Sequence, residues 1–595
     1  MKIGKRLFDL VGKSRRLYLL ATLCSVITMT VAVSTPVITG TTIDIILGNQ
    51  LAGLQEQVVN ILGGVHHIRY HLWIPFILIV VSAFIRSCFA YISGKMSVKA
   101  SDNVARKMQD DIYDHLQHLP YDYHVKAKTG DLIQRCTSDV ENIRAFLSAQ
   151  VMEIIRTTMY CGFIMAVLLG LDWQLTLISV SIVPIIFASA FIFHHRMKDV
   201  FEQQDQMEGE LFSAMQENLE GVRVVRAFGR SSFEAERFES KNIEFRDLAR
   251  RFASIRAVFW GSSDFLCFMQ IFMTLYFGIL AVNRAEITVG TYVIFLTYIS
   301  LLVWPLRNLA RVLADMGRME VSLNRIEDIL NTPLEEETPG ATAHDLAGDI
   351  VFEEVSFGYD DKLILNGLSM HIKQGETVAL LGGTGSGKST IMHLLLRLYD
   401  DRSGNIRING KAIETISKKH LRQQIGLVLQ EPYLYSKTIL ENLKMSKDLV
   451  TDPEVYTATQ TTKVHDTIQR FEAGYDTLLG ERGVTLSGGQ RQRVAMARTI
   501  IKNSDILIFD DSLSAVDTDT DQQIRQALKA RSGNTTTIII SGRIATLKEA
   551  DRIFILEEGR ITDVGNHAEL ISRETLYKKI WDIQTSLESE LVDYA

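Results

Sequence analysis

Six long apolar stretches lie in the first half of the chain, and they limit its possible folds more than any other feature. A helix needs about 20 mostly apolar residues to cross the roughly 30 Å hydrocarbon core of a bilayer. Only helices and closed barrels can satisfy their backbone polar groups there. The stretches therefore predict an all-α membrane domain over residues 1–330. We place the six spans near residues 17–46, 71–94, 149–171, 174–195, 257–282 and 290–312.

The basic residues predict the orientation of these spans. The connection between the third and fourth spans carries no Lys or Arg, and the next short connection carries only Arg284. The N-terminus and the segments 95–148 and 196–256 are rich in both. Because basic residues accumulate on the cytoplasmic side, we expect both termini to be cytoplasmic. A compact chain without targeting extensions favours a multi-pass protein of a bacterial plasma membrane, with an organelle membrane as the alternative.

The two long polar segments are predicted to continue the spans as cytoplasmic helices, because they are poor in Gly and Pro and contain periodic apolar residues. About 25 residues in each direction would reach roughly 37 Å beyond the bilayer. Their turning points fall near residues 119–135 and 217–229. Pattern alone explains them equally well as solvated helical hairpins.

Three polar residues lie inside or near the ends of the predicted spans: Arg86, Asp264 and Gln270. Polar groups at this depth are costly and commonly face a bundle interior or an aqueous cavity. They are therefore candidates for a substrate path. The alternatives are a structural pair, a side chain that reaches the interface, or a misplaced span boundary.

The average composition conceals two unlike halves. The 595 residues are 47% hydrophobic, which is high for a soluble enzyme, and 22% charged, which is high for a pure membrane bundle. A net charge of −7 leaves no cationic surplus, so nucleic acid is not an expected partner. Prolines, a glycine and an acidic run make residues 331–347 a predicted linker. The strand-like pattern that follows predicts a soluble domain over residues 348–595.

This second domain contains a phosphate-binding motif. An apolar strand precedes it and a helical run follows it, which is the context that the motif requires. Glycines let backbone N–H groups approach phosphate oxygens, Lys388 is expected to reach the β- and γ-phosphates of ATP, and Ser389 is expected to bind Mg²⁺. The motif consists of Gly382, Gly383, Thr384, Gly385, Ser386, Gly387, Lys388, Ser389 and Thr390.

A buried strand ending in a carboxylate occurs further along the same domain, at residues 506–510. Its last residue, Asp510, is expected to help hold Mg²⁺. Alone this signal is weak, because many buried strands end in Asp. Together with the phosphate-binding motif, it predicts an α/β P-loop domain.

The run Leu486, Ser487, Gly488, Gly489 and Gln490 resembles the signature motif of ABC proteins. With the six spans, the helical extensions and the order of motifs, nearly the whole chain resembles an ABC exporter half-transporter. That resemblance implies a six-helix transmembrane domain with long cytoplasmic helices, fused to an α/β ABC nucleotide-binding domain. It also implies that the turning segments 119–135 and 217–229 are coupling helices.

The resemblance assigns further roles. Ser487, Gly488, Gly489 and Gln490 would contact ATP held by the other chain of a dimer. Tyr359 would stack on adenine, and Gln430 would contact Mg²⁺ and the coupling region. Residues 481–483 would touch the helical extensions, and residues 514–517 would cross the dimer interface. Each has a simpler interpretation: a strand aromatic, a surface amide, or a flexible loop that caps a helix.

Two positions depart from the family pattern. In the family, a Glu that polarises the attacking water follows the Asp of the Walker B strand, which is Asp510 here, and a His in a later loop contacts the γ-phosphate. This chain has Asp511 in place of the Glu and Gly542 in place of the His. Asp is one methylene shorter than Glu, and a catalytic group displaced by about 1 Å can lose about a hundredfold in rate. We therefore expect the site on this P-loop to bind ATP with Mg²⁺ but to hydrolyse it slowly or not at all.

The intact signature motif predicts that this chain helps hydrolysis at the P-loop of a second, non-identical half-transporter. The expected function is ATP-driven export of small amphiphilic, multidrug-like compounds by a heterodimer embedded in membrane lipids. Alternatives are a weakly active homodimer in which Asp511 acts through a water, a lipid or peptide exporter, and a nucleotide-gated regulatory ABC protein. Six spans disfavour a DNA-repair ATPase with the same signature.

Overall fold

The computed structural model describes residues 11–593, except 50, 52–53, 62–63, 361, 401, 513–517 and 532–534. The chain divides into two compact units. The membrane unit comprises Met1–His118 and Ala127–Pro333, and the nucleotide unit comprises Leu119–Lys126 and Leu334–Ala595. The first predicted turning segment is thus shared between the units, because its residues 119–126 pack with the nucleotide unit.

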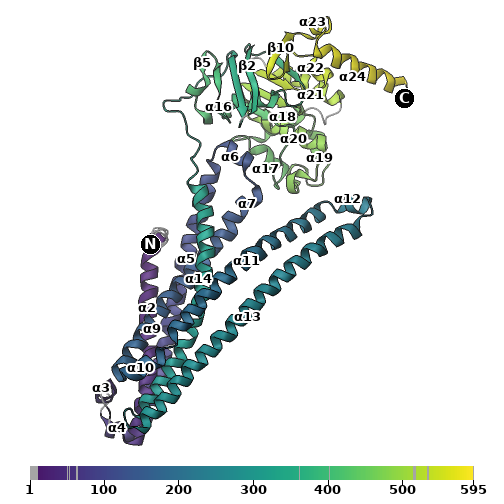
Figure 1. The fold of residues 1–595 in the computed structure, drawn as a ribbon. Coiled ribbons are helices and arrows are strands. Elements are labelled where there is room, and N and C mark those ends of the chain that lie inside the picture. Colours follow the sequence, from purple (N-terminus) through teal and green to yellow (C-terminus); the bar gives the residue numbers. More distant parts are fainter. Residues whose placement is uncertain are drawn as a thin grey trace. The chain divides into compact units, whose positions relative to one another are not determined.

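The membrane unit is entirely helical in its described part (Figure 1). Within the described residues, five helical stretches are long and apolar enough to cross a membrane, and the last helix of this unit carries a shorter apolar stretch, Val289–Val303. The long helices are α2 (Arg15–Leu47), α5 (Trp73–Gln117), α9 (Val151–Leu171), α11 (Val183–Glu220), α13 (Ser231–Asn283) and α14 (Val289–Leu330). Short helices connect them: η1 (Gly12–Ser14), α3 (Leu54–Ile61), α4 (Val65–Tyr70), α7 (Thr129–Gln134), α8 (Val140–Ala145), α10 (Trp173–Val180) and α12 (Val222–Ala227).

The helices differ in detail from six uninterrupted spans. The stretch predicted near 174–195 is divided by a turn at residues 181–182, and α11 begins with Pro184 in its first turn. Proline is tolerated there because the first helical N–H groups have no partner within the helix. Pro305 lies inside α14, which continues on both sides of it.

Two widened turns interrupt the helix that leads into α9. The π-helical turns η2 (Arg135–Asp139) and η3 (Phe146–Gln150) flank α8. Such turns free backbone carbonyl groups and occur frequently at functional sites. The second of them lines a cavity that is described below.

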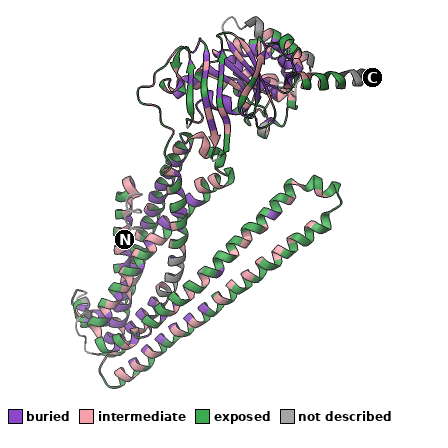
Figure 2. Cartoon of the chain, turned by 45° about the horizontal axis from the view of Figure 1, so that its top comes forward, coloured by how far each residue is buried: buried purple, intermediate pink, exposed green. Residues whose placement is uncertain are grey.

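The hairpin of α11 and α13 exposes most of the residues in its outer half (Figure 2). Its tip is formed by the end of α11, by α12 and by the start of α13, which covers the second predicted turning segment. Ion pairs of Lys241 with Glu210 and of Arg237 with Glu217 join its arms. Exposed ion pairs contribute little to stability, so the hairpin depends mainly on helix packing near its base.

The nucleotide unit contains two sheets. A six-stranded sheet has the order β10-β9-β3-β8-β7-β6, and a four-stranded antiparallel sheet has the order β2-β1-β4-β5. The strands are β1 (Ile350–Tyr359), β2 (Lys362–Ile372), β3 (Thr377–Gly382), β4 (Ser403–Ile408), β5 (Lys411–Ala412), β6 (Ile425–Val428), β7 (Ile506–Asp510), β8 (Thr536–Ile540), β9 (Arg552–Glu557) and β10 (Arg560–Gly565).

Helices cover these sheets and add a separate helical layer. This layer has its own apolar core, which includes Leu443, Val455 and Val494. It is built from α17 (Ile439–Lys444), α18 (Asp452–Thr461), α19 (His465–Gln469) and α20 (Gly488–Ile501). The remaining helices are α6 (Tyr121–Lys126), α15 (Lys388–Leu395), α16 (Lys418–Gln424), α21 (Thr518–Arg531), α22 (Ile544–Leu547), α23 (His567–Ile571) and α24 (Leu576–Asp593), with single turns at Ile413–Thr415, Gly474–Asp476 and Glu481–Gly483.

The predicted linker is held against the nucleotide unit. Glu335 accepts hydrogen bonds from both terminal nitrogens of Arg422 at 2.7 and 2.6 Å. Glu337 accepts backbone N–H bonds from Lys418 and Lys419 at the start of α16. A carboxylate is favoured at a helix N-terminus, where N–H groups lack partners within the helix. The segment therefore has specific contacts although its composition is typical of a linker.

A buried carboxylate organises one end of the membrane unit. Asp44 is fully buried in α2 and accepts hydrogen bonds from Gln55, from Thr288 at 2.6 Å and from the backbone N–H of Gly290 at 2.9 Å. Several hydrogen bonds are needed to offset the cost of burying a charge. Asp44 thus connects α2, α3 and the start of α14.

Gly290 provides the close approach of α2 and α14 that this arrangement requires. A Cβ atom at Gly290 would overlap the Gly40 carbonyl oxygen and the Asp44 carboxylate. We expect Gly290→Ala to separate the two helices at a cost of about 1–3 kcal/mol. Thermal unfolding of the purified protein in detergent checks this. Gly261→Ala is the matched control, since a Cβ there has no neighbour within 4 Å, and equal effects of the two substitutions would contradict the prediction.

Candidate ATP site

The predicted nucleotide residues gather at one edge of the six-stranded sheet. Strands β3, β8, β7 and β6 are adjacent and parallel, so their carboxyl ends lie at the same edge. Ligands of open α/β sheets bind outside these ends. Lys388 follows β3, Gly542 follows β8, Asp511 follows β7, and Gln430 follows β6. Segments more than 150 residues apart in sequence therefore contribute to one site.

The loop between β3 and α15 has the conformation of a phosphate cradle. Gly385 and Gly387 adopt left-handed conformations with φ of +81° and +103°, which glycine accepts at low cost. The Lys388 ammonium donates to the carbonyl oxygens of Gly382 and Gly383, both at 2.8 Å. The buried hydroxyl of Ser386 has no hydrogen-bond partner among the described residues. Backbone N–H groups, a cation and an unpaired hydroxyl fit the oxygens of a phosphate.

The oxygens expected to hold Mg²⁺ are close together. The Ser389 hydroxyl donates to Asp510 Oδ2 at 3.2 Å. Burial raises the pKa of Asp510, and the neighbouring Asp511 raises it further. Burial also lowers the pKa of Lys388. A divalent cation would favour the ionised carboxylate, and hydroxyl and carboxylate oxygens are ligands that Mg²⁺ prefers.

Asp511 is held between the neighbouring strands. Its φ of +42° is left-handed, a conformation that Asp adopts more readily than most residues. Its backbone N–H donates to the Ile540 carbonyl at 2.8 Å. Its carboxylate accepts long hydrogen bonds from Gln430 at 3.4 Å and from the Ser541 hydroxyl at 3.5 Å. The structure therefore brings Gln430 and Asp511 together, and Ser541 is a contact that sequence analysis missed.

Gly542, at the position where a His is expected, is surrounded by open space. A Cβ atom there would have no neighbour within 4 Å. Gln584 of α24 holds the loop instead: its amide donates to the Gly542 carbonyl and accepts from the Ile544 N–H, both at 2.9 Å. No motif identifies Gln584, because its role depends on how the distant helix α24 packs.

Tyr359 belongs to an aromatic cluster in this structure. Its hydroxyl interacts with Thr390 at 3.4 Å and with His393 at 3.1 Å. Its ring lies edge-on to Tyr399, and Tyr121 of α6 contacts the rings of both His393 and Tyr399. Helix α6 therefore contacts the C-terminal end of α15, the helix that follows the P-loop. Sequence analysis missed His393 and Tyr399 because single aromatic residues carry no pattern.

The signature residues form the N-terminus of α20. Ser487 and Gln490 make a capping box, in which the Gln490 side chain accepts from the Ser487 N–H at 2.9 Å. Ser487 and Gly488 are exposed, and Gly489 is half-buried. An exposed N-terminus of a helix attracts anions. Residues 514–517 lie outside the described residues.

The structure does not gather the three candidates for a substrate path. Arg86 is exposed, and Asp264 is half-buried. Gln270 is fully buried, and neither polar atom of its side chain is hydrogen-bonded within the described part of the chain. A cavity among α2, α5 and α9 is lined by other polar residues, including Glu153 and Arg156. Opposite charges three residues apart in an apolar run were the signal that sequence analysis overlooked.

Two adjacent glycines test the geometry of the phosphate loop. A Cβ at Gly382 would overlap the Leu556 carbonyl oxygen, whereas one at Gly383 has open space. We expect Gly382→Ala to weaken ATP binding by about 1–3 kcal/mol, or roughly tenfold to a hundredfold. Gly383→Ala should bind nearly as well as the natural chain. Titration with a fluorescent ATP analogue measures both, and equal losses would contradict this geometry.

Comparison with known proteins identifies the family of the chain. Models of the ABC transporter transmembrane region and of the ABC transporter match residues 18–306 and 365–514. A putative multidrug export ATP-binding/permease protein of Bacillus subtilis, YgaD, is 34% identical over 80% of this chain and 82% of its own. An ATP-dependent lipid A-core flippase of Syntrophus aciditrophicus is 30% identical, covering 86% and 85%.

The fold has a solved counterpart. A bacterial Atm1-family ABC exporter with ATP bound superposes with a TM-score of 0.82 at 26% identity, covering 96% of this chain and 99% of that one. The predicted fold class, a helical membrane domain plus an α/β nucleotide-binding domain, is confirmed. The chain belongs to the ABC transporter family, as an exporter-type half-transporter whose membrane-spanning domain is fused to an ATP-binding domain.

Proposed function

We propose that this chain is one half of a heterodimeric exporter and that its own P-loop site binds ATP but hydrolyses it slowly. The observation that carries the proposal is the combination of a complete phosphate loop with Asp511 and Gly542. The Asp511 carboxylate lies at 3.4–3.5 Å from Gln430 and Ser541. Gly542 offers no group to a γ-phosphate. A site of this kind holds nucleotide well and positions water poorly.

Binding is supported by residues whose geometry is favourable. Lys388 and the backbone N–H groups of Thr384 and Gly385 would hold the phosphates, and Tyr359 would contact the adenine. Ser389, Asp510 and Gln430 would hold Mg²⁺, which neutralises phosphate charge when bound. The altered positions are therefore confined to those proposed to orient water and to contact the γ-phosphate.

The partner is inferred from the signature helix. Ser487, Gly488, Gly489 and Gln490 present an exposed helix N-terminus, which suits the γ-phosphate of an ATP held elsewhere. A second chain with Glu and His in the two altered positions would then hydrolyse ATP with help from this one. A homodimer of this chain would lack both groups at each site.

The proposed substrate is a small amphiphilic compound. The relatives named above are a multidrug export protein and a lipid A-core flippase, so lipid export is the second candidate. The basic cytoplasmic segments support cytoplasmic termini, and the bacterial relatives support a plasma membrane. The transporter would alternate between inward-facing and outward-facing states, and ATP hydrolysis at the partner's P-loop would reset this cycle and drive export.

Restoring the two missing groups should restore hydrolysis. We expect the purified chain to hydrolyse ATP slowly, and Asp511→Glu with Gly542→His to raise the rate by at least about tenfold, because general-base groups contribute about 10²–10⁴. A Cβ atom at Gly542 meets no described residue within 4 Å, so the first atom of the new side chain causes no clash. Phosphate release by the purified chain measures the rate. Rapid hydrolysis by the natural chain that Asp511→Asn abolishes would overturn the proposal.

A second test uses the complex purified through a tag on this chain. It distinguishes completion of the partner's site by this chain from hydrolysis at its own site. Gly488→Asp should abolish most hydrolysis, since a carboxylate would repel the γ-phosphate, although a Cβ at Gly488 touches nothing in this chain. Asp511→Asn should leave the rate within about twofold, because the proposed hydrolysis occurs at the partner's site. The opposite pattern would show that this chain's own site performs the reaction.

A further inference from the structure

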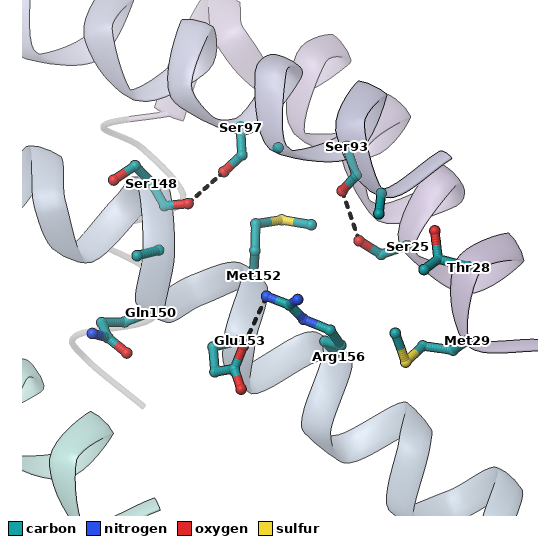
Figure 3. Close-up of a pocket in the computed structure, with 13 residues that line it drawn as sticks. Ser25, Thr28, Met29, Ser93, Ser97, Ser148, Gln150, Met152, Glu153 and Arg156 are labelled. Carbon is teal, nitrogen blue, oxygen red and sulfur yellow. Dashed lines mark hydrogen bonds and ion pairs between the residues drawn. The ribbon is translucent and has the colours of Figure 1, made fainter. Parts of the chain in front are cut away.

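The membrane unit contains a partly open cavity that the nucleotide chemistry does not use. It has a volume of about 200 Å³ and lies among α2, α5, the π-helical turn η3 and α9 (Figure 3). Ser25 and Thr28 lie in the first predicted span, and Glu153 and Arg156 lie near the start of the third. By the predicted orientation, these positions belong to the cytoplasmic half of the spans.

The hydroxyl groups that line the cavity already donate hydrogen bonds to other protein groups. Ser97 donates to the Ser148 carbonyl at 2.8 Å, Thr28 donates to Cys24, and Ser93 donates to Ala21. Because the single proton of Ser93 is used, the 2.7 Å contact between Ser25 and Ser93 requires Ser25 to be the donor. These hydroxyl oxygens therefore offer only lone pairs to a ligand. The cavity wall is rich in hydrogen-bond acceptors.

The charged groups of the cavity lie on α9. Glu153 and Arg156 form an ion pair at 2.7 Å, and Arg156 is 48% exposed while Glu153 is 22% exposed. Charge inside a membrane span is costly and commonly functional. The longer and more exposed Arg156 can move its head group toward water, whereas Glu153 remains at the cavity wall. Two thioethers, those of Met29 and Met152, complete the lining.

We propose that this cavity binds the protonated amine of an amphiphilic compound, with the ammonium N–H groups bonded to Glu153 and to the serine hydroxyls. The N–H groups of such a cation can donate to the hydroxyl oxygens, whose own protons are already used. The cation also replaces Arg156 as the partner of Glu153. An anionic head group would meet the Glu153 carboxylate and hydroxyls that cannot donate. Among the lining side chains, only Arg156 and the Gln150 amide would favour it, and the Gln150 amide already donates to Asp315 at 2.6 Å.

The size of the cavity limits which part of the compound it holds. Sites that enclose drug-sized molecules measure about 300–1,000 Å³. A volume of about 200 Å³ accommodates an ammonium group and a few carbons. The apolar remainder would extend out of the cavity. The inference rests on the proposed export of amphiphiles and names the class: primary alkylamines rather than neutral or anionic compounds.

Binding of dodecylammonium to the full chain in phosphatidylcholine nanodiscs, without ATP, tests the inference. Choline head groups lack N–H donors, so the lipid does not compete. We expect Glu153→Gln to weaken binding by at least about tenfold, the scale of a lost charge-assisted hydrogen bond. Arg156→Gln should strengthen binding, because Glu153 loses its internal partner. Dodecyltrimethylammonium, which has the same charge but no N–H group, should bind at least about threefold more weakly than dodecylammonium.

Glu141→Gln is the matched control, since Glu141 is exposed on α8 and pairs with Arg144 three residues away. It should leave binding unchanged. Unchanged binding in Glu153→Gln, or equal binding of the two cations, would overturn the inference. Weaker binding in Arg156→Gln, with preference for dodecyl phosphate, would assign the cavity to anionic head groups instead. Because neither ATP nor a partner is used, these results are independent of the hydrolysis tests of the proposed heterodimer.

Discussion

The parallel pairing of β3, β8, β7 and β6 is the constraint on which the nucleotide site depends. It brings the phosphate loop, Asp510, Gln430 and the loop of Gly542 to one edge, although they are distant in sequence. The same pairing exposes the asymmetry of the site. The groups that would hold phosphate and Mg²⁺ are complete, whereas the two positions expected to orient water and contact the γ-phosphate carry a short carboxylate and no side chain. Family membership makes export the function of the whole protein, and this asymmetry supports a partner that differs from the chain.

In the membrane unit, the governing constraint is that polar groups need partners away from water. Asp44 meets it with hydrogen bonds from α3 and from the start of α14. Ser93 and Ser97 of the cavity meet it by donating to backbone carbonyl groups. Gln270 is an exception, because its buried amide has no partner in the described structure. The same rule determines the chemistry of the cavity wall. Hydroxyl groups that already donate their protons still offer lone pairs as acceptors, and Glu153 adds a negative charge. The hydroxyl groups that stabilise the fold here are thus also the groups proposed to bind a ligand.

Most of the fold was predictable because its signals are local. Apolar stretches of the required length, the glycine-rich loop and the capped signature helix each occupy one short segment. What could not be predicted depends on packing. The break at residues 181–182 follows from a proline near a helix start, and the contact of Gln584 with Gly542 joins elements 42 residues apart. Glu153 and Arg156 became visible as a site only once α2, α5 and α9 were placed together. Conversely, Arg86, Asp264 and Gln270 were chosen for polarity alone, and they do not line the cavity.

The central claim is that ATP remains intact in this chain's site while the complex works. Photolabelling with a radioactive azido-ATP during turnover, followed by separation of the two chains and chromatography of the attached nucleotide, measures this directly. The account predicts mainly ATP on this chain and mainly ADP on its partner. The account would be contradicted if ADP made up the same fraction of the attached nucleotide on both chains. It would also be contradicted if the labelled complex contained only this chain.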